Sequence, residues 1–272
     1  MSFKLDHISV SQYSTWSRCQ KQWYFRYIEG LRVPPNVNMI VGSGVHSGAE
    51  TIYRQKKALD TYNLNEALDA TRDYIEYSDA NEEVEWDKPK AETKDTAVKM
   101  LRVYSSDVRI PDKIAGRHIE GIEIPLSIKL KRRDTSVLIK ARPDLVLTNK
   151  VVDIKTAGRK PSSLPMNVIL QTHLYAIALK KSETEAHYII RTKNPTAFER
   201  NAGDVTKESI TVIQNLLINF WEGLQTAIKS GNFLPTGITH DYACAYCGYG
   251  KIGLCKYSKL KEYRRSKKRS KK

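Results

Sequence analysis

The chain is poor in cysteine, with only four in 272 residues, and three of these lie between residues 244 and 255. Two disulfides would be a sparse framework for a secreted protein of this length. The opening segment MSFKLDHISV is too polar for a signal peptide, and no apolar run reaches the length of a membrane-spanning helix. We therefore expect a protein of the reducing cytoplasm, or of the nucleus in a eukaryotic source, with no membrane partner.

Two further features are missing from the sequence. There is no internal repeat, and no GxxxxGK[ST] phosphate-binding loop. Any step driven by nucleotide hydrolysis, such as the unwinding of a duplex, would have to come from a partner.

Acidic residues are outnumbered by basic ones, 30 to 45, which gives a formal net charge of +15. The segment 256–272 holds ten Lys or Arg and one Glu, so it carries +9, and the first 255 residues carry +6. Without apolar periodicity, this tail is expected to be disordered or a frayed helix extension. It could bind phosphate backbones through Lys267, Lys268 and Arg269, which is the interpretation we favour. A solubilising tail or a nuclear-import signal is the alternative.

The distribution of apolar residues predicts an α/β fold. Helical periodicity covers residues 11–28, 43–58, 64–78, 93–107, 166–181 and 206–230, and strand-like runs lie between His118 and Thr156 and in AHYIIRT. A strand, a helix and a strand in succession indicate a crossover, and hence a mixed sheet flanked by helices.

The segment ARPDLVLTNKVVDIKT, residues 141–156, carries three charged groups on apolar runs. Its two β-branched or leucine-rich stretches flank Asn149-Lys150, which predicts a tight hairpin that brings Asp144 close to Asp153. Lys155 lies on the same face as Asp153, because side chains alternate along a strand. Two carboxylates and an amine suit a hard divalent cation and the charge of a phosphoryl transition state. The alternative is a structural salt bridge from Asp153 to Lys155 or to Arg142.

Two other segments could supply the same site. In IVGSGVHSGAE, Gly42 and Gly44 precede His46, so an imidazole would stand near the start of a helix, where it could bind a transition metal. In LQTHLYAIAL, Gln171 and Tyr175 are four residues apart and share one helix face. By itself, a lone histidine or an exposed Gln/Tyr pair would usually have no such role.

The ordered set GxxxH, PD, DxK and QxxxY resembles the PD-(D/E)xK nuclease superfamily, in particular its RecB-like exonuclease branch. The N-terminal ISVSQYSTWSRCQKQWYFRYIEGL is similar to that branch as well. The resemblance implies a restriction-endonuclease-like core with an N-terminal helical region and a C-terminal cysteine loop. It implies one nuclease domain over 1–255, with a helical insertion at about 53–110 and a catalytic core at about 111–200. The chain departs from the family at Ala141 to Pro143, where a glycine is frequent.

For the site, the resemblance implies a Mg²⁺ or Mn²⁺ ion held by His46, Asp144, Asp153 and the backbone carbonyl of Ile154. Lys155 would position or deprotonate the attacking water. Gln171 and Tyr175 would orient Lys155 and the DNA backbone, and Arg142 would contact nucleic acid.

The cysteines form a C-x2-C pair followed by a third cysteine after seven residues, a pattern typical of metal or cluster ligands. Thiolates suit zinc and iron-sulfur clusters alike, and the spacing does not choose between them. A subgroup of RecB-like nucleases carries one cysteine before the core and three after it, which hold a 4Fe-4S cluster. The resemblance therefore implies Cys19, Cys244, Cys247 and Cys255 as its ligands at the two ends of the domain. The gap of seven is long for that subgroup and keeps Zn²⁺ as the alternative.

The activity implied is that of a DNA exonuclease that prefers single strands, in recombination, repair or phage replication, with a helicase or recombination protein as a partner. Two alternatives stay open: a zinc-stabilised nucleic-acid-binding protein with a vestigial site, and a structure-specific endonuclease. The sequence leaves cleavage polarity and oligomeric state open.

Overall fold

The computed structural model describes residues 5–87, 89–236, 243–244 and 247–258. The chain divides into two compact units. The sheet unit comprises Pro35–Ile128 and Ala141–Ile213, and the terminal unit comprises Met1–Pro34, Lys129–Lys140 and Gln214–Lys272. The expectation of a single nuclease domain over 1–255 stays a prediction.

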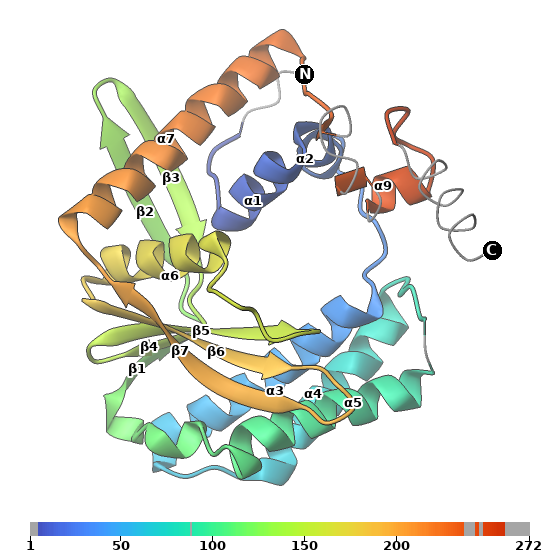
Figure 1. The fold of residues 1–272 in the computed structure, drawn as a ribbon, viewed down its shortest axis with the longest axis vertical. Helices are drawn as coiled ribbons and strands as arrows, with labels where there is room; N and C mark the ends of the chain where they lie inside the picture. The colour runs from blue at the N-terminus through green and yellow to red at the C-terminus, as the bar shows by residue number, and fades with distance from the viewer. Residues whose placement is uncertain (1–4, 88, 237–242, 245–246, 259–272) are drawn as a thin grey trace. The chain divides into compact units, whose positions relative to one another are not determined.

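The sheet unit is built on a five-stranded sheet in the order β1-β4-β5-β6-β7 (Figure 1). Its strands are β1 (Ile119–Ile122), β4 (Leu145–Leu147), β5 (Lys150–Ala157), β6 (Glu183–Ile190) and β7 (Thr196–Asp204). Only the β5/β6 pair is parallel, and the other three pairs are antiparallel. The predicted mixed sheet flanked by helices is confirmed. Strand β7 was not predicted.

Helices cover both faces of this sheet (Figure 1). On one face Val152, Ile154 and Ile189 pack into the main core with α3 (Val37–Leu59), α4 (Leu64–Asn81) and α5 (Lys90–Arg102). On the other face Val151, on β5, and Tyr188, on β6, pack against α6 (Met166–Leu179). The π-helical turn η1 (Val103–Asp107) extends α5, and two 3-10 turns, η2 (Pro111–Lys113) and η3 (Gly116–His118), lead into β1.

Helix α3 begins six residues earlier than the periodicity predicted, at Val37. The side chain of Asn36 caps it by accepting a hydrogen bond from the Met39 amide at 3.2 Å. The prediction that His46 stands near a helix start is therefore wrong, because more than two turns precede it. Residue 53, the expected start of the helical insertion, lies inside this continuous helix.

The terminal unit is held by aromatic side chains. Helices α1 (Val10–Arg18), α2 (Gln20–Tyr27) and α9 (Gly248–Lys251) belong to it, together with most of α7 (Lys207–Ser230) and of the hairpin of β2 (Leu126–Arg132) and β3 (Thr135–Ala141). Trp23 is fully buried and contacts the rings of Trp16 and Phe233. The single helix predicted over 11–28 is wrong, because Cys19 adopts an extended conformation (φ −168°, ψ 117°) that separates α1 from α2. Within the described ranges, no helix is both long and apolar enough to cross a membrane.

Gly48 allows α3 to approach α4 and α5 closely. A methyl group at this position would come within 2.2 Å of Thr71 Oγ1 and 2.4 Å of Leu101 Cδ2. We expect Gly48→Ala to lower the free energy of unfolding by about 1–3 kcal/mol through overpacking, although alanine favours a helix interior. Gly223→Ala, on α7, is the control, because its Cβ would meet no atom within 4 Å. Thermal melts should show a lower melting temperature for the first variant only, and equal melting temperatures would contradict this account of the packing.

Candidate active site

The β4/β5 hairpin brings the two predicted carboxylates to one end of the sheet. The strands pair antiparallel with Leu145 opposite Val152, which confirms the predicted hairpin and places Asp144 beside the chain of β5. Asp144 Oδ2 accepts a hydrogen bond from the Ile154 amide at 2.5 Å. This bond fixes the first carboxylate against the strand that carries the second.

Asp153 and Lys155 lie on one face of β5, and Lys155 Nζ is 2.7 Å from Asp153 Oδ2. The Asp153 side chain is only 1% exposed. This ion pair is made through Oδ2, and Oδ1 has no hydrogen-bond partner among the described residues. A buried carboxylate with unused acceptor capacity is costly unless a cation compensates it. The predicted salt bridge exists, but it does not satisfy Asp153.

Helix α6 supplies two polar side chains to the same place. Lys155 Nζ donates to Gln171 Oε1 at 3.1 Å, and Gln171 Nε2 donates to Tyr175 Oη at 2.7 Å. Gln171 and Tyr175 share a helix face because they are four residues apart. The structure thus connects both residues of the predicted QxxxY pattern to the amine of Lys155.

His46 reaches the site from α3 on the opposite side of β5. A methyl group on Gly42, one turn before His46, would lie 2.8 Å from Thr156 Oγ1, so glycine allows the helix to approach the strand. His46 Nδ1 lies 3.7 Å from Asp144 Oδ1. The GxxxH pattern therefore combines a close-approach glycine with a polar side chain directed at Asp144.

Glu123 is a site residue that the sequence analysis missed. His46, Glu123 and Asp144 each place one potential ligand atom within 4.8 Å of the others, whereas Asp153 lies outside this group. Glu123 directly follows β1, and its amide donates to the Asp144 carbonyl at 3.1 Å. The sequence signal that could have identified Glu123 was an acidic residue at the end of a strand. That signal points to the site only once β1 is known to pair with β4, which carries the chain on from Asp144. Arg142, predicted to contact nucleic acid, is 64% exposed and lies 4.0 Å from Glu123.

The three carboxyl groups of the site do not titrate alike. Burial raises the pKa of Glu123 to about 7, and the neighbouring Asp144 charge adds to the effect. Burial also raises the pKa of Asp153 to about 6, against the opposing effect of Lys155. Burial would raise the pKa of Asp144 too, but His46 and Lys155 hold it below its ordinary value. Asp144 is thus the carboxylate that stays ionised, and a bound cation would favour the ionised forms of the other two.

Comparison with protein families gives the family of the chain. The model of the PD-(D/E)XK nuclease superfamily matches residues 7–252. The chain belongs to the PD-(D/E)XK nuclease superfamily.

Other comparisons concern the fold of this PD-(D/E)XK nuclease. A crystal structure from Eubacterium rectale, described as a "putative exonuclease", aligns with a TM-score of 0.55 at 10% identity, covering 91% of this chain and 88% of that one. A structure described as SSO0001 aligns with a TM-score of 0.38 at 14% identity, covering 83% and 87%. No curated protein matches the sequence. The family implies hydrolysis of nucleic acid with divalent metal ions, and the donors of His46, Glu123 and Asp144 fit such an ion.

The raised pKa of Asp153 predicts a pH-dependent cost to stability. Its ordinary value is 3.8 and its folded value about 6, so the folded protein holds this proton more tightly than the unfolded chain. The resulting stabilisation is present below pH 4 and is lost as the pH rises through 6. We expect the melting temperature of Asp153→Asn minus that of the unchanged protein to become more positive as the pH rises from 4 to 7. Differential scanning fluorimetry checks this, and a constant difference across that range would contradict it.

A second group of potential ligands in the sheet unit is already satisfied. It consists of Glu185, His187 and Glu199, which the sequence analysis did not single out. His187 hydrogen-bonds to Tyr104 Oη at 2.7 Å and to Glu185 Oε1 at 2.8 Å, and both glutamates are ion-paired with lysines. The group is therefore held by its own hydrogen bonds and ion pairs, and only His187 among its members is buried.

The four cysteines come together in the terminal unit. All are free thiols, and all line one pocket together with Gln22, Phe25, Pro235, Ala243, Tyr249 and Ser258. Burial raises the pKa values of Cys247 and Cys255, and the proximity of Cys19 adds to both. Although all four are described, no three of their sulfur atoms lie within 4.8 Å of one another. The predicted tail residues Lys267, Lys268 and Arg269 lie outside the described part of the chain.

Proposed function

We propose that this nuclease is a Mg²⁺- or Mn²⁺-dependent DNA exonuclease that prefers single strands. The observation that supports it most is the meeting of Asp144, Asp153 and Lys155 at the β4/β5 hairpin, with Oδ1 of the buried Asp153 carboxylate lacking a hydrogen-bond partner among the described residues. Such a carboxylate is suited to a cation and has little use in a binding protein.

The cation would be held by Asp144, Asp153 and His46, together with the carbonyl of Ile154. Glu123 joins this set on the strength of its proximity to His46 and Asp144. Carboxylate and carbonyl oxygens suit Mg²⁺, and the imidazole shifts the preference toward Mn²⁺.

The chain's own groups then divide the work of hydrolysis. When bound, the cation supplies Lewis-acid chemistry, which lowers the pKa of a water and offsets charge on the scissile phosphate. Lys155 positions this water or helps to deprotonate it and stabilises the charge that develops on phosphate oxygen. Gln171 holds the amine, and Tyr175 holds Gln171. Arg142, which is largely exposed, contacts the DNA backbone.

The assignment to DNA ends and single strands rests on the resemblance to RecB-like exonucleases. The Eubacterium rectale protein of similar fold, described as a "putative exonuclease", is consistent with it. Recombination, repair or phage replication would be the setting, with a helicase or recombination protein as a partner. Four free thiols suit a reducing compartment such as the cytoplasm.

Digestion of end-labelled oligonucleotides tests this function. With Mn²⁺, single-stranded DNA should be shortened from an end, duplex DNA more slowly, and chelation should stop the reaction. Blocking each end in turn gives the polarity. Internal cuts in branched substrates would favour a structure-specific endonuclease, and binding without cleavage would favour the vestigial site.

We also propose that Cys19, Cys244, Cys247 and Cys255 hold a 4Fe-4S cluster that ties the two ends of the chain together. Tetrahedral zinc with bonds of about 2.3 Å would bring its sulfur ligands to about 3.8 Å from one another. The lining of one pocket by all four thiols supports a group that they share. Absorbance near 400 nm, where thiolate-to-iron charge transfer is expected, together with about four irons per chain would support the cluster. A colourless protein with one zinc would refute it.

A further inference from the structure

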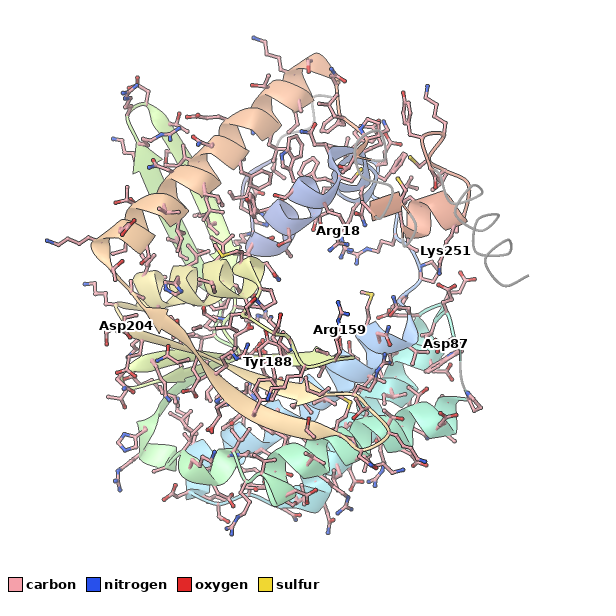
Figure 2. All side chains as sticks on the ribbon, viewed as in Figure 1. Arg18, Asp87, Arg159, Tyr188, Asp204 and Lys251 are labelled. Atoms are coloured by element: carbon pink, nitrogen blue, oxygen red, sulfur yellow. The ribbon has the colours of Figure 1, made fainter. Side chains whose placement is uncertain are left out.

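Tyr188 is a buried residue of the sheet unit that none of the recognised motifs includes. It lies on β6, in the body of the sheet (Figure 2), and is 3% exposed. Its hydroxyl is fully buried and has no hydrogen-bond partner among the described residues. Buried hydroxyls are nearly always satisfied, so an unsatisfied one calls for an explanation.

The sheet places Tyr188 beside Lys155, the lysine of the proposed site. Strands β5 and β6 are parallel, and Tyr188 pairs in register with Lys155. Paired residues on neighbouring strands point to the same face and are about 4.8 Å apart at the backbone. Of the charges that affect the pKa of Tyr188, those of Lys155 and Asp153 are the strongest.

Lys155 has capacity for one more partner. Its ammonium group carries three N–H donors. Asp153 faces one of them at 2.7 Å and Gln171 accepts another at 3.1 Å, which leaves a third. A cation held by Asp153 would compete with Lys155 for that carboxylate, and the amine would then need another acceptor.

We propose that Tyr188 is a positioning residue for this reaction, its hydroxyl oxygen accepting a hydrogen bond from Lys155 and holding the amine toward the scissile phosphate. The proposal rests on the proposed nuclease function. Tyr188 would act through Lys155 and not on the substrate, because its hydroxyl group has no exposed surface.

The ring of Tyr188 is held independently of its hydroxyl. It stacks on Phe198 with centroids 5.4 Å apart and planes at 10°, and Val168 and Ile190 belong to the same core cluster. Phenylalanine can therefore replace Tyr188 without changing the packing. Burial raises the pKa of Tyr188, so the group is a neutral hydroxyl at neutral pH.

The test is steady-state kinetics of Tyr188→Phe with Mn²⁺ and single-stranded DNA. We expect kcat to fall by about 10- to 100-fold through misplacement of Lys155. We expect no change in KM or in DNA affinity, which fluorescence anisotropy measures in EDTA. The melting temperature should stay unchanged or rise. A kcat within twofold of the unchanged protein, or a loss that follows a lower melting temperature, would overturn the proposal.

Tyr62→Phe is the matched control. Its hydroxyl group lies 3.0 Å from the Ser105 carbonyl oxygen and 3.1 Å from Asp112 Oδ1, and it can donate its single hydrogen to either; neither contact involves Lys155. This variant should melt at a lower temperature with an unchanged kcat. Lys155→Ala distinguishes failure of the proposed nuclease function from failure of the role of Tyr188. If this variant keeps full activity, the proposed function fails. If it is inactive while Tyr188→Phe is fully active, only the role of Tyr188 fails.

Discussion

Replacing Lys155 with alanine is expected to reduce the rate of DNA cleavage by about 1,000-fold, because no other amine among the described residues contacts Asp153. Asp153→Ala should have an effect at least as large, since it removes a proposed ligand of the cation. The measurement is single-turnover digestion of an end-labelled single strand with saturating enzyme, which excludes effects on binding.

Folding must be controlled in this experiment, because removal of one charge leaves the other buried. The double variant Asp153→Asn, Lys155→Met removes both charges and should be inactive but stably folded and still able to bind DNA. The control is the double variant Asp95→Ala, Lys99→Ala, which changes an aspartate and a lysine on the exposed face of α5. It should keep full activity. Metal-dependent cleavage by the Asp153→Asn, Lys155→Met protein at the normal rate would refute the site.

Replacing Cys19 with serine is expected to remove the proposed cluster and to lower the melting temperature of the terminal unit by about 10 °C. Cys19 comes from the start of the chain, whereas the other three cysteines come from its end, so a group bound by all four links segments more than 200 residues apart. Binding energy of this kind contributes directly to the stability of the fold. Calorimetry and the absorbance spectrum should change together.

Ser258→Ala is the matched change, because Ser258 lines the same pocket without a thiol. It should keep the absorbance and most of the stability. If Cys19→Ser melted like the unchanged protein and kept its full metal content, Cys19 would not be a ligand.

The parts of the fold that could be predicted were those in which local pattern and tertiary structure agree. The hairpin of residues 141–156 has strong apolar strands on either side of Asn149-Lys150, and the structure forms it as predicted. Strand β7, TAFERNAGD, was missed because it is an edge strand with little apolar alternation, and pairing with β6 determines its conformation. The break at Cys19 was missed because no proline or glycine marks it anywhere between residues 11 and 28.

The site residues that could be predicted are those whose shared face follows from their spacing along the chain. Asp153 and Lys155 share a face because they are two residues apart, and Gln171 and Tyr175 because they are four apart. Glu123 belongs to the site only because Ile122 pairs with Leu145, a contact across 23 residues that no local pattern specifies. Tyr188 likewise depends on the parallel register of β5 and β6.

The most direct test of the metal site is anomalous diffraction from crystals soaked in Mn²⁺. The account predicts one strong peak bounded by Asp144, Asp153 and His46, with Glu123 beside it. A peak at Glu185, His187 and Glu199 instead, or no manganese near Asp153, would contradict it.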